Sequence, residues 1–356
     1  MTRAWNRCLS GSFVVAQQAS PSASDLTFTA TVHYESKLPG AGVRHLGSDT
    51  FEGLAEAVTS EVTVAAILER AGELTMLHAC GVADSSGAVV ALVAKSGTGK
   101  TTASSQLART FGYITDETVA IRADGSVVPY PKPLSVKQTT PGAAKLQVGP
   151  DELGLKTAPD NPRITAIALL DRVAGGDYQL PVIEPVPLVE AVLSLIPDTS
   201  SQAAVVQPLQ SLCQLIDSVG GVFRVSYSEA ADLKDSLAPL FLAKLSNPAD
   251  ADRDWSPTKV EPEAGLGAEP IPAGWLQRTA AVDAVEIGEE LLVLTETELT
   301  RLSGIGPIIW QSARRPVSMQ TIVDRIEARH GLPEGYEALL DAAVDGLVGQ
   351  GLLLRG

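Results

Sequence analysis

The chain has 356 residues, with 42 acidic and 27 basic side chains and a formal net charge of −15. This charge disfavours nonspecific binding to nucleic acid or to an anionic membrane, although a nucleotide needs only a local positive field. The length favours two domains. The 3 cysteines are far apart and predict neither disulfides nor a zinc site, and no apolar run approaches the ~20 residues of a membrane span. We therefore expect a cytoplasmic protein.

The segments before residue 95 predict a strand, a helix and two further strands. Residues 26–34 alternate apolar and polar side chains and are rich in strand-forming residues. Residues 50–70 repeat apolar side chains at helical spacing. Residues 76–82 and 87–93 are apolar runs on either side of a turn, so we expect a pair of strands with the second one buried. His78 lies on the first of them, where a core role and a functional role are both open.

A phosphate-binding loop is predicted at residues 94–101, Ala-Lys-Ser-Gly-Thr-Gly-Lys-Thr. The segment lies between the apolar strand 87–93 and a predicted helix at 101–109, which is the context that such a loop requires. Backbone N–H groups of the loop and of the helix N-terminus attract an anion. Lys100 would reach the outer phosphates, and the Thr101 hydroxyl would hold Mg²⁺. The predicted nucleotide-binding residues are Ser96, Gly97, Thr98, Gly99, Lys100, Thr101 and Thr102.

The loop departs from the usual pattern at its first position, where Ala94 replaces glycine. Alanine is the smallest replacement, and its expected cost is some freedom of φ at the loop entrance. The alternative interpretation of the segment is a glycine-rich turn that binds nothing.

Two adjacent acids follow the next apolar run. Residues 111–115 are followed by Asp116 and Glu117, and a second apolar run begins at Thr118. Acids at the end of a strand near a phosphate loop are where metal ligation and general-base work usually occur. One acid can deprotonate an attacking hydroxyl while its neighbour holds Mg²⁺, so both are candidate site residues. The alternative is an ordinary solvated turn.

A rigid basic segment follows at residues 129–137, where three prolines in five residues fix an extended backbone. It carries Lys132 and Lys137 in a chain that is acidic overall. These lysines are candidates for a phosphate clamp. A surface loop that happens to contain lysines is the equal alternative.

The rest of the chain predicts the end of this domain, a linker and a second domain. We expect a strand at 164–170, helices at 187–196 and 209–219, a strand at 222–227 and a helix at 230–245. Prolines and aspartates from residue 246 indicate a linker. Beyond it we expect strands at 281–287 and 290–294, helices at 298–310, 319–330 and 336–348, and a terminal β stretch. This order is winged-helix-like, but without a basic recognition helix it does not predict DNA binding.

The sequence around the loop resembles the HPr kinase/phosphorylase family. The matching residues are His78, residues 96–101 and residues 113–121, where the family has two consecutive aspartates and this chain has Asp116 and Glu117. The resemblance implies a fold like that of phosphoenolpyruvate carboxykinase, with Asp116 as the base for a protein hydroxyl. It also implies that Glu117 supports Asp116 or Mg²⁺, and that His78 is an active-site residue.

This resemblance has motif strength over residues 70–140 and extends more weakly to 245. The family's arginine–glycine motif is not found downstream, which leaves phosphorylase activity and the HPr substrate open. Residues 131–134, Pro-Lys-Pro-Leu, resemble kinase homologues found beside peptide-modification enzymes, such as lasso-peptide tail kinases.

Residues 280–356 resemble the PqqD-like family, whose members recognise leader peptides of ribosomally made, modified peptides. The matching stretches are 294–297, 306–310, 321–326 and 347–353. The resemblance implies that a peptide binds as an added β-strand at a sheet edge. The edge is expected at 284–286 or 292–294, with Val285, Leu292 and Val293 as peptide-binding residues, while Trp310 is expected in the core.

The expected fold is an α/β P-loop kinase domain of the HPr kinase and phosphoenolpyruvate carboxykinase-like type, followed by a small α+β, winged-helix-like PqqD domain. The expected parts are a weakly structured N-terminus (1–25), the nucleotide-binding domain (26–245), a linker (246–275) and the peptide-recognition domain (276–356).

The expected function is an ATP- and Mg²⁺-dependent kinase that phosphorylates a Ser or Thr hydroxyl of a precursor peptide or small carrier protein. Two alternatives stay open: a nucleotide-binding adaptor that presents a leader peptide to a separate enzyme, and a kinase of a small hydroxylated metabolite. The acceptor, the nucleotide preference and the oligomeric state, a homo-oligomer included, also stay open.

Overall fold

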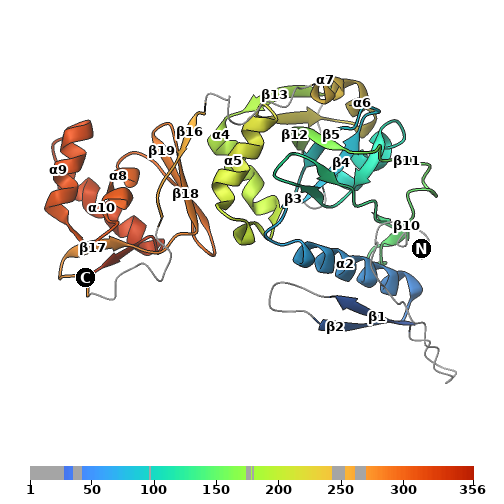
Figure 1. Cartoon of the computed structure of the whole chain (residues 1–356), viewed down its shortest axis with the longest axis horizontal. Coiled ribbons are helices and arrows are strands. Elements are labelled where there is room, and N and C mark those ends of the chain that lie inside the picture. The colour runs from blue at the N-terminus through green and yellow to red at the C-terminus, as the bar shows by residue number, and fades with distance from the viewer. Residues whose placement is uncertain are drawn as a thin grey trace. The chain divides into compact units, whose positions relative to one another are not determined.

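The computed structural model describes residues 28–34, 42–95, 98–173, 178, 180–242, 253–260 and 270–356. The chain divides into two compact units (Figure 1). The N-terminal unit comprises residues 1–206 and 214–251, and the C-terminal unit comprises residues 207–213 and 252–356. The predicted weakly structured segment 1–25 lies outside the described residues.

The N-terminal unit is built on a mixed sheet of seven strands. In spatial order these are β11 (Lys156–Thr157), β6 (Gly112–Thr115), β4 (Ala79–Ala83), β5 (Ala88–Val93), β12 (Arg163–Arg172), β15 (Val222–Tyr227) and β13 (Val182–Val186). β5, β12 and β15 pair in parallel, whereas β4 is antiparallel to both β5 and β6. β5, β6, β12 and β15 therefore run in one direction, and their carboxyl ends meet at one edge of the sheet.

The local sequence explains why β4 and β5 form where the apolar runs predict them. Every residue of β5 is buried, as expected for a strand between two neighbours. The Asp84 carboxylate accepts hydrogen bonds from the backbone N–H groups of Ser86 (2.8 Å) and Ala88 (3.0 Å), which closes the turn between the strands. Gly87 supplies the positive φ of +92° that this turn needs.

A smaller sheet of four strands brings two predicted site segments to the same end. Its order is β14 (Thr199–Ser200), β3 (Thr75–Leu77), β7 (Val119–Ile121) and β8 (Val127–Val128). β3 and β7 are antiparallel, with Leu77 opposite Val119. His78 directly follows β3, and Glu117 lies two residues before β7, so the pairing places them close together.

Helices and short strands complete the N-terminal unit. They are β1 (Phe28–Tyr34), β2 (Gly42–Ser48), α2 (Phe51–Glu69), α3 (Lys100–Leu107), β9 (Leu134–Val136), β10 (Leu146–Val148) and α4 (Leu188–Leu195), with α5 (Pro208–Ser218) running from residues of one unit into those of the other. Figure 1 shows α2 alongside the antiparallel β1–β2 pair. The Thr50 hydroxyl caps α2 by accepting from the Gly53 N–H at 3.1 Å. α3 packs Ala103 and Leu107 into the core beside β4.

The predicted single helix at 230–245 is wrong. Its described part, residues 230–242, forms a 3₁₀ turn (Ala230–Asp232) and two short helices, α6 (Leu233–Ser236) and α7 (Ala238–Phe241), while residues 243–245 lie outside the described residues. Pro239 lies in the first turn of α7, where a residue without an N–H starts a helix more readily than it continues one.

The C-terminal unit contains two sheets, three complete helices and the first part of α5 within its described residues. One sheet has the order β16 (Trp255–Pro257), β18 (Asp283–Ile287), β19 (Glu290–Leu294) and β20 (Leu299–Leu302), and the other has the order β21 (Val317–Ser318), β17 (Trp275–Arg278) and β22 (Leu353–Arg355). The helices are α8 (Gly306–Ser312), α9 (Met319–His330) and α10 (Tyr336–Gly349). The unit also includes residues 207–213, where the Asp283 carboxylate accepts from the backbone N–H groups of Leu209 (2.9 Å) and Gln210 (3.0 Å).

The predicted sheet edge in the C-terminal unit is wrong. β18 and β19, which carry Val285, Leu292 and Val293, are the two central strands, and all three side chains are fully buried. The edges of this sheet are β16 and β20. β16 lies inside the segment 246–275, which its prolines and aspartates predicted to be a linker. Of that segment, residues 246–252 and 261–269 lie outside the described residues.

The predicted helix at 298–310 is also replaced by two elements. β20 pairs with β19 over four residues, and α8 begins only at Gly306. Gly304 has a φ of +60°, which interrupts a helix, and Pro307 stands in the first turn of α8. The predicted helices at 319–330 and 336–348 match α9 and α10, and Ser318 caps α9 by accepting from the Thr321 N–H at 3.3 Å.

Trp310 lies in the core of the C-terminal unit, as expected. It is fully buried, and the Arg278 guanidinium carbon lies 4.1 Å from the ring centroid. Within the part of the chain that the structure describes, no helix is both long enough and apolar enough to span a bilayer.

Candidate active site

The predicted phosphate loop connects β5 to α3 at the carboxyl edge of the seven-stranded sheet. Gly99 is the N-cap of α3 and has a φ of +104°, a conformation that L side chains rarely adopt, so the backbone requires glycine here. No side chain among the described residues caps α3, which leaves its first N–H groups available to an anion. Ser96 and Gly97 lie outside the described residues, and Thr98 and Thr102 are exposed.

Ala94 occupies the first position of the loop without backbone strain. It is buried in the core of the N-terminal unit and is not among the described non-glycine residues with a positive φ. The freedom that glycine would offer is therefore not needed at this position. The Ala94 carbonyl accepts a hydrogen bond from the Lys100 ammonium, so the two ends of the loop are joined.

Lys100 is held against the loop in a buried position. Burial lowers the pKa of Lys100 below its ordinary value, and the nearby charges of Asp198, Glu117 and Asp116 oppose that change. Lys100 thus contacts the Ala94 carbonyl and is close enough to these carboxylates for their charges to affect its pKa.

Asp116 is bonded to three different segments. The Thr101 hydroxyl donates to Oδ2 at 3.1 Å, while the Tyr113 hydroxyl (3.1 Å) and the Lys132 ammonium (2.9 Å) reach Oδ1. The Asp116 side chain is only 2% exposed. Both of its oxygens are therefore engaged in an enclosed position, next to the first turn of α3.

Glu117 is the more open member of the acid pair. Its side chain is 34% exposed, and Oε2 lies 3.0 Å from the Lys132 ammonium. The Thr115 hydroxyl accepts from the backbone N–H groups of Glu117 (3.2 Å) and Thr118 (3.3 Å), which fixes the turn after β6. A hydroxyl substrate would reach Glu117 more readily than Asp116.

Lys132 is an internal cation and does not offer the surface clamp that the sequence predicts. Its side chain is 1% exposed, between the carboxylates of Asp116 and Glu117. Burial alone would lower the pKa of Lys132, but the charges and hydrogen bonds of the two carboxylates outweigh it and raise that pKa above its ordinary value. Lys137, the other predicted clamp residue, is exposed.

His78 lies beside the same group. Its backbone N–H donates to the Asp198 carbonyl at 2.6 Å. Burial, and then the charge of Lys100, lower the pKa of His78, against the opposing charges of Glu117 and Asp198. The structure therefore brings His78 together with Lys100 and Glu117, while its role in a reaction stays a prediction.

Sequence reasoning missed Asp198 and Tyr113. Asp198 reaches the site because β14, the strand that follows it, pairs with β3. The Tyr113 hydroxyl donates to Asp116 and also lies 3.2 Å from the Lys132 carbonyl, so it ties the acid to the lysine segment. Tyr113 opens the matching stretch 113–121 but was not named as a site residue, whereas Asp198 belongs to no motif and only the strand pairing indicates its place.

Tyr227 is a third residue that the motifs did not indicate. It ends β15 at the carboxyl edge and is 2% exposed. A Cβ atom built on Gly99 would lie 3.6 Å from the Tyr227 hydroxyl oxygen. No hydrogen bond to this hydroxyl is present among the described residues, and burial, followed by the neighbouring Cys80 thiol, raises the pKa of Tyr227. Within the described part of the chain, a hydroxyl without a hydrogen-bond partner thus lies beside the glycine that precedes α3.

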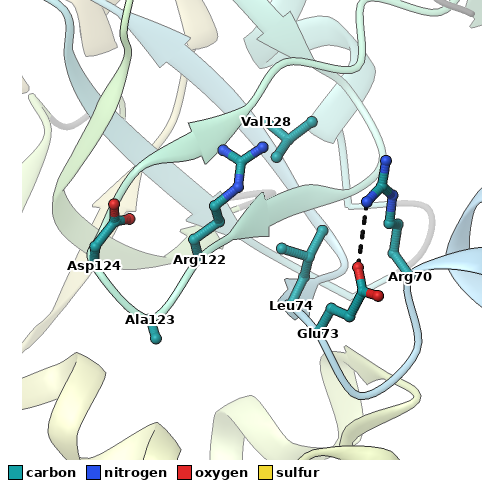
Figure 2. Close-up of a pocket in the computed structure, with 7 residues that line it drawn as sticks. All are labelled: Arg70, Glu73, Leu74, Arg122, Ala123, Asp124 and Val128. Atoms are coloured by element: carbon teal, nitrogen blue, oxygen red, sulfur yellow. Dashed lines mark hydrogen bonds and ion pairs between the residues drawn. The ribbon is translucent and has the colours of Figure 1, made fainter.

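A separate hollow lies at the other end of β3 and β7 (Figure 2). It has a volume of about 430 Å³ and is lined by Arg70, Glu73, Leu74, Arg122, Ala123, Asp124 and Val128. Figure 2 shows the Arg70–Glu73 pair, whose atoms are 3.2 Å apart. The lining includes none of the predicted site residues, and its two arginines are balanced by two acids.

The oxygen donors of the site fit Mg²⁺. Mg²⁺ is usually bound through one or two carboxylates together with substrate phosphates, and it retains several waters. The Thr101 hydroxyl beside Asp116 Oδ2 provides such a partial donor set. Among the described residues, no group of three or more His, Cys, Asp or Glu side chains could hold a metal ion by itself. The site therefore fits a metal that arrives together with phosphates.

Taken together, the fold and the candidate site define a mixed α/β protein in which a strand–loop–helix segment lies beside a pair of acids. No protein-family model matches the chain, and no curated protein matches it. Among solved structures, the Hpr(Ser) kinase/phosphatase from Coxiella burnetii aligns with 12% identity over 46% of this chain and 92% of that chain, with a TM-score of 0.26. A TM-score this low supports no conclusion about fold or activity, so none of the roles proposed below rests on this alignment.

Proposed function

We propose that this protein is an ATP-dependent kinase that transfers the γ-phosphoryl group to a hydroxyl acceptor. The observation that carries the proposal is the hydrogen bond of 3.1 Å from Thr101 to Asp116. It joins the start of α3, next to the glycine-bearing loop, to the acid pair after β6. An ordinary solvated turn would not enclose Asp116 between a loop threonine and a buried lysine.

The proposed roles follow from exposure and contacts. Lys100 and the N–H groups of α3 stabilise negative charge on the phosphates, because they converge at the end of the loop. Thr101 and Asp116 Oδ2 hold Mg²⁺, which when bound neutralises phosphate charge. These groups contribute positioning and electrostatic stabilisation, which supply most of the catalysis in phosphoryl transfer.

Glu117 is the proposed general base, in place of the Asp116 that family resemblance implies. Both Asp116 oxygens are engaged, and its side chain is 2% exposed, whereas the Glu117 side chain is 34% exposed. As the acceptor oxygen bonds to phosphorus and the bond to the leaving ADP oxygen breaks, the hydroxyl proton passes to Glu117.

The proposed acceptor is a Ser or Thr hydroxyl of a precursor peptide or small carrier protein, bound through the C-terminal unit. The support is the resemblance of residues 280–356 to leader-peptide binders, together with the edge strands β16 and β20, where a peptide strand could add. Tethering would raise the local acceptor concentration to ~mM for a flexible connection.

The test uses the full chain with Mg²⁺ and γ-labelled ATP. Binding of ATP is measured by calorimetry, and transfer is measured to peptides that contain Ser or Thr and to the same peptides with Ala at those positions. Peptides encoded beside the gene are the first acceptors to try. Label on the hydroxyl peptides alone supports the proposal. ATP binding without transfer to any peptide favours the adaptor, and the absence of ATP binding contradicts both.

A further inference from the structure

We propose that Lys132 takes the place of a divalent metal ion between Asp116 and Glu117, so that the nucleotide-free protein binds no free metal at this carboxylate pair. The metal then enters only on the Thr101 side, together with phosphates. This inference deepens the proposed function, because it says how many cations the acid pair requires. Its test does not depend on phosphoryl transfer.

The three hydrogen-bond donors of the Lys132 ammonium are matched by three acceptors. These are Asp116 Oδ1 at 2.9 Å, Glu117 Oε2 at 3.0 Å and the Pro133 carbonyl at 3.1 Å. The ammonium therefore bridges the two carboxylates as a bound metal ion would. It has no donor left over for a phosphate.

The segment that carries Lys132 is built into the site. Pro131 and Pro133 restrict the backbone on both sides of the lysine. The Lys132 carbonyl lies 3.2 Å from the Tyr113 hydroxyl, which also donates to Asp116, and the Lys132 N–H donates to the Tyr130 carbonyl at 2.8 Å. The Tyr113 hydroxyl thus contacts both the Asp116 carboxylate and the backbone of Lys132.

The two Asp116 oxygens have separate tasks in this arrangement. Oδ1 faces Lys132 and Tyr113, and Oδ2 faces Thr101. Only the Oδ2 side is next to the loop. A metal ion that accompanies phosphates can therefore contact Asp116 without displacing the lysine, and the pair keeps one permanent positive charge.

Removing the lysine should turn the pair into a metal site. In Lys132→Met, Asp116 loses its charged partner, and breaking a buried ion pair in this way is strongly destabilising. A divalent cation can restore the missing charge, because carboxylate oxygens are the ligands that Mg²⁺ and Mn²⁺ prefer. Metal that binds only the folded state must then raise its stability.

The experiment measures thermal unfolding and Mn²⁺ binding by electron paramagnetic resonance on the full chain without nucleotide. Lys132→Met is expected to unfold at a lower temperature than wild type, to regain much of the loss as Mn²⁺ is added, and to bind Mn²⁺ about tenfold more tightly or better. The wild type and Lys156→Met, which changes an exposed lysine, should respond weakly and alike. The double variant Lys132→Met/Asp116→Asn should lose the Mn²⁺ response.

Three results would overturn the inference. They are wild-type Mn²⁺ binding as tight as that of Lys132→Met, a Lys132→Met protein that folds but gains nothing from Mn²⁺, and a Lys132→Met protein that stays unfolded at saturating Mn²⁺. Because nucleotide is absent throughout, a failure of ATP binding or transfer in the wild type would be a separate result. It would remove the proposed kinase activity and leave the cation assignment standing.

Discussion

The Thr101 hydroxyl lies 3.1 Å from Asp116 Oδ2. Fifteen residues separate the two positions in the chain, and one lies in the first turn of α3 while the other follows β6. The bond sets the distance between the N-terminus of α3 and the acid pair. In the proposed kinase this distance decides whether donor and acceptor meet in line.

Removing the Thr101 hydroxyl should impair use of the metal. Thr101→Ala is expected to lower kcat by about 10²-fold or more, since one precisely placed polar group at a reacting centre contributes about this much. Thr101→Ser keeps the hydroxyl and should retain most of the activity. Rates measured over a series of Mg²⁺ concentrations check the prediction, and equal rates for the two variants would contradict it.

Substitution of Glu117 and substitution of Asp116 should impair the protein in different ways. Glu117→Gln is expected to lower kcat by about 10²–10⁴-fold with nearly unchanged ATP affinity, as loss of a general base does. Asp116→Asn should instead weaken Mg²⁺-dependent ATP binding and destabilise the fold by up to about 3–5 kcal/mol, because Lys132 keeps a buried charge with less compensation. Steady-state kinetics, calorimetry and urea denaturation separate these effects. Full transfer activity in Glu117→Gln would return the base to Asp116.

The Tyr227 hydroxyl should contribute to ATP binding and contribute little to the stability of the fold. Tyr227→Phe removes only this oxygen, which has no hydrogen bond among the described residues and lies beside Gly99. ATP affinity is expected to fall severalfold, by about 1 kcal/mol for a lost neutral hydrogen bond. The melting temperature without nucleotide should hardly change. Tyr130→Phe is a matched control, since the Tyr130 hydroxyl lies 3.0 Å from Thr63. An unchanged ATP affinity in Tyr227→Phe would refute the role.

Stability should fall in mild acid because of His78. The pKa of His78 is lower in the folded state than its ordinary value of 6.5, so the unfolded chain binds more protons near that pH. The contribution of this residue to folding is therefore fully present above about pH 6.5 and is lost as the pH falls through the folded-state pKa. Urea denaturation of wild type and His78→Gln at several pH values between about 5 and 7.5 tests this. If the free energy of unfolding changes equally with pH in wild type and His78→Gln, His78 is not the source of the acid sensitivity.

The sequence predicted those parts of the fold that have local signals. β5 is a continuous apolar run and α9 has a serine cap, so each was visible within about ten residues. The helices predicted at 230–245 and 298–310 failed because apolar spacing there was helical while Pro239, Gly304 and Pro307 broke the backbone. The edge of the C-terminal sheet was predicted wrongly because the edge strand β16 lies in a segment without apolar periodicity.

The site was predictable only where its residues are close to the loop motif. Asp116 and Glu117 follow the loop after one helix and one strand, and the structure places Asp116 against Thr101. Asp198 and Tyr227 reach the same region through pairing with distant strands, which a single sequence does not reveal. The sequence did not predict the burial of Lys132, because its partners Asp116 and Glu117 lie in a different segment of the chain.

The tryptophans are distributed unequally between the two units. Trp255, Trp275 and Trp310 belong to the C-terminal unit, and the remaining one, Trp5, precedes the described residues. Fluorescence excited selectively at tryptophan will therefore report mainly on the C-terminal unit, with the indole of Trp310 quenched or released according to its contact with Arg278. Tyrosine emission will include the phosphate-loop region, through Tyr113 and Tyr227. The native chain thus carries two kinds of optical reporter, with which the proposed peptide docking and nucleotide binding can be tested without labels.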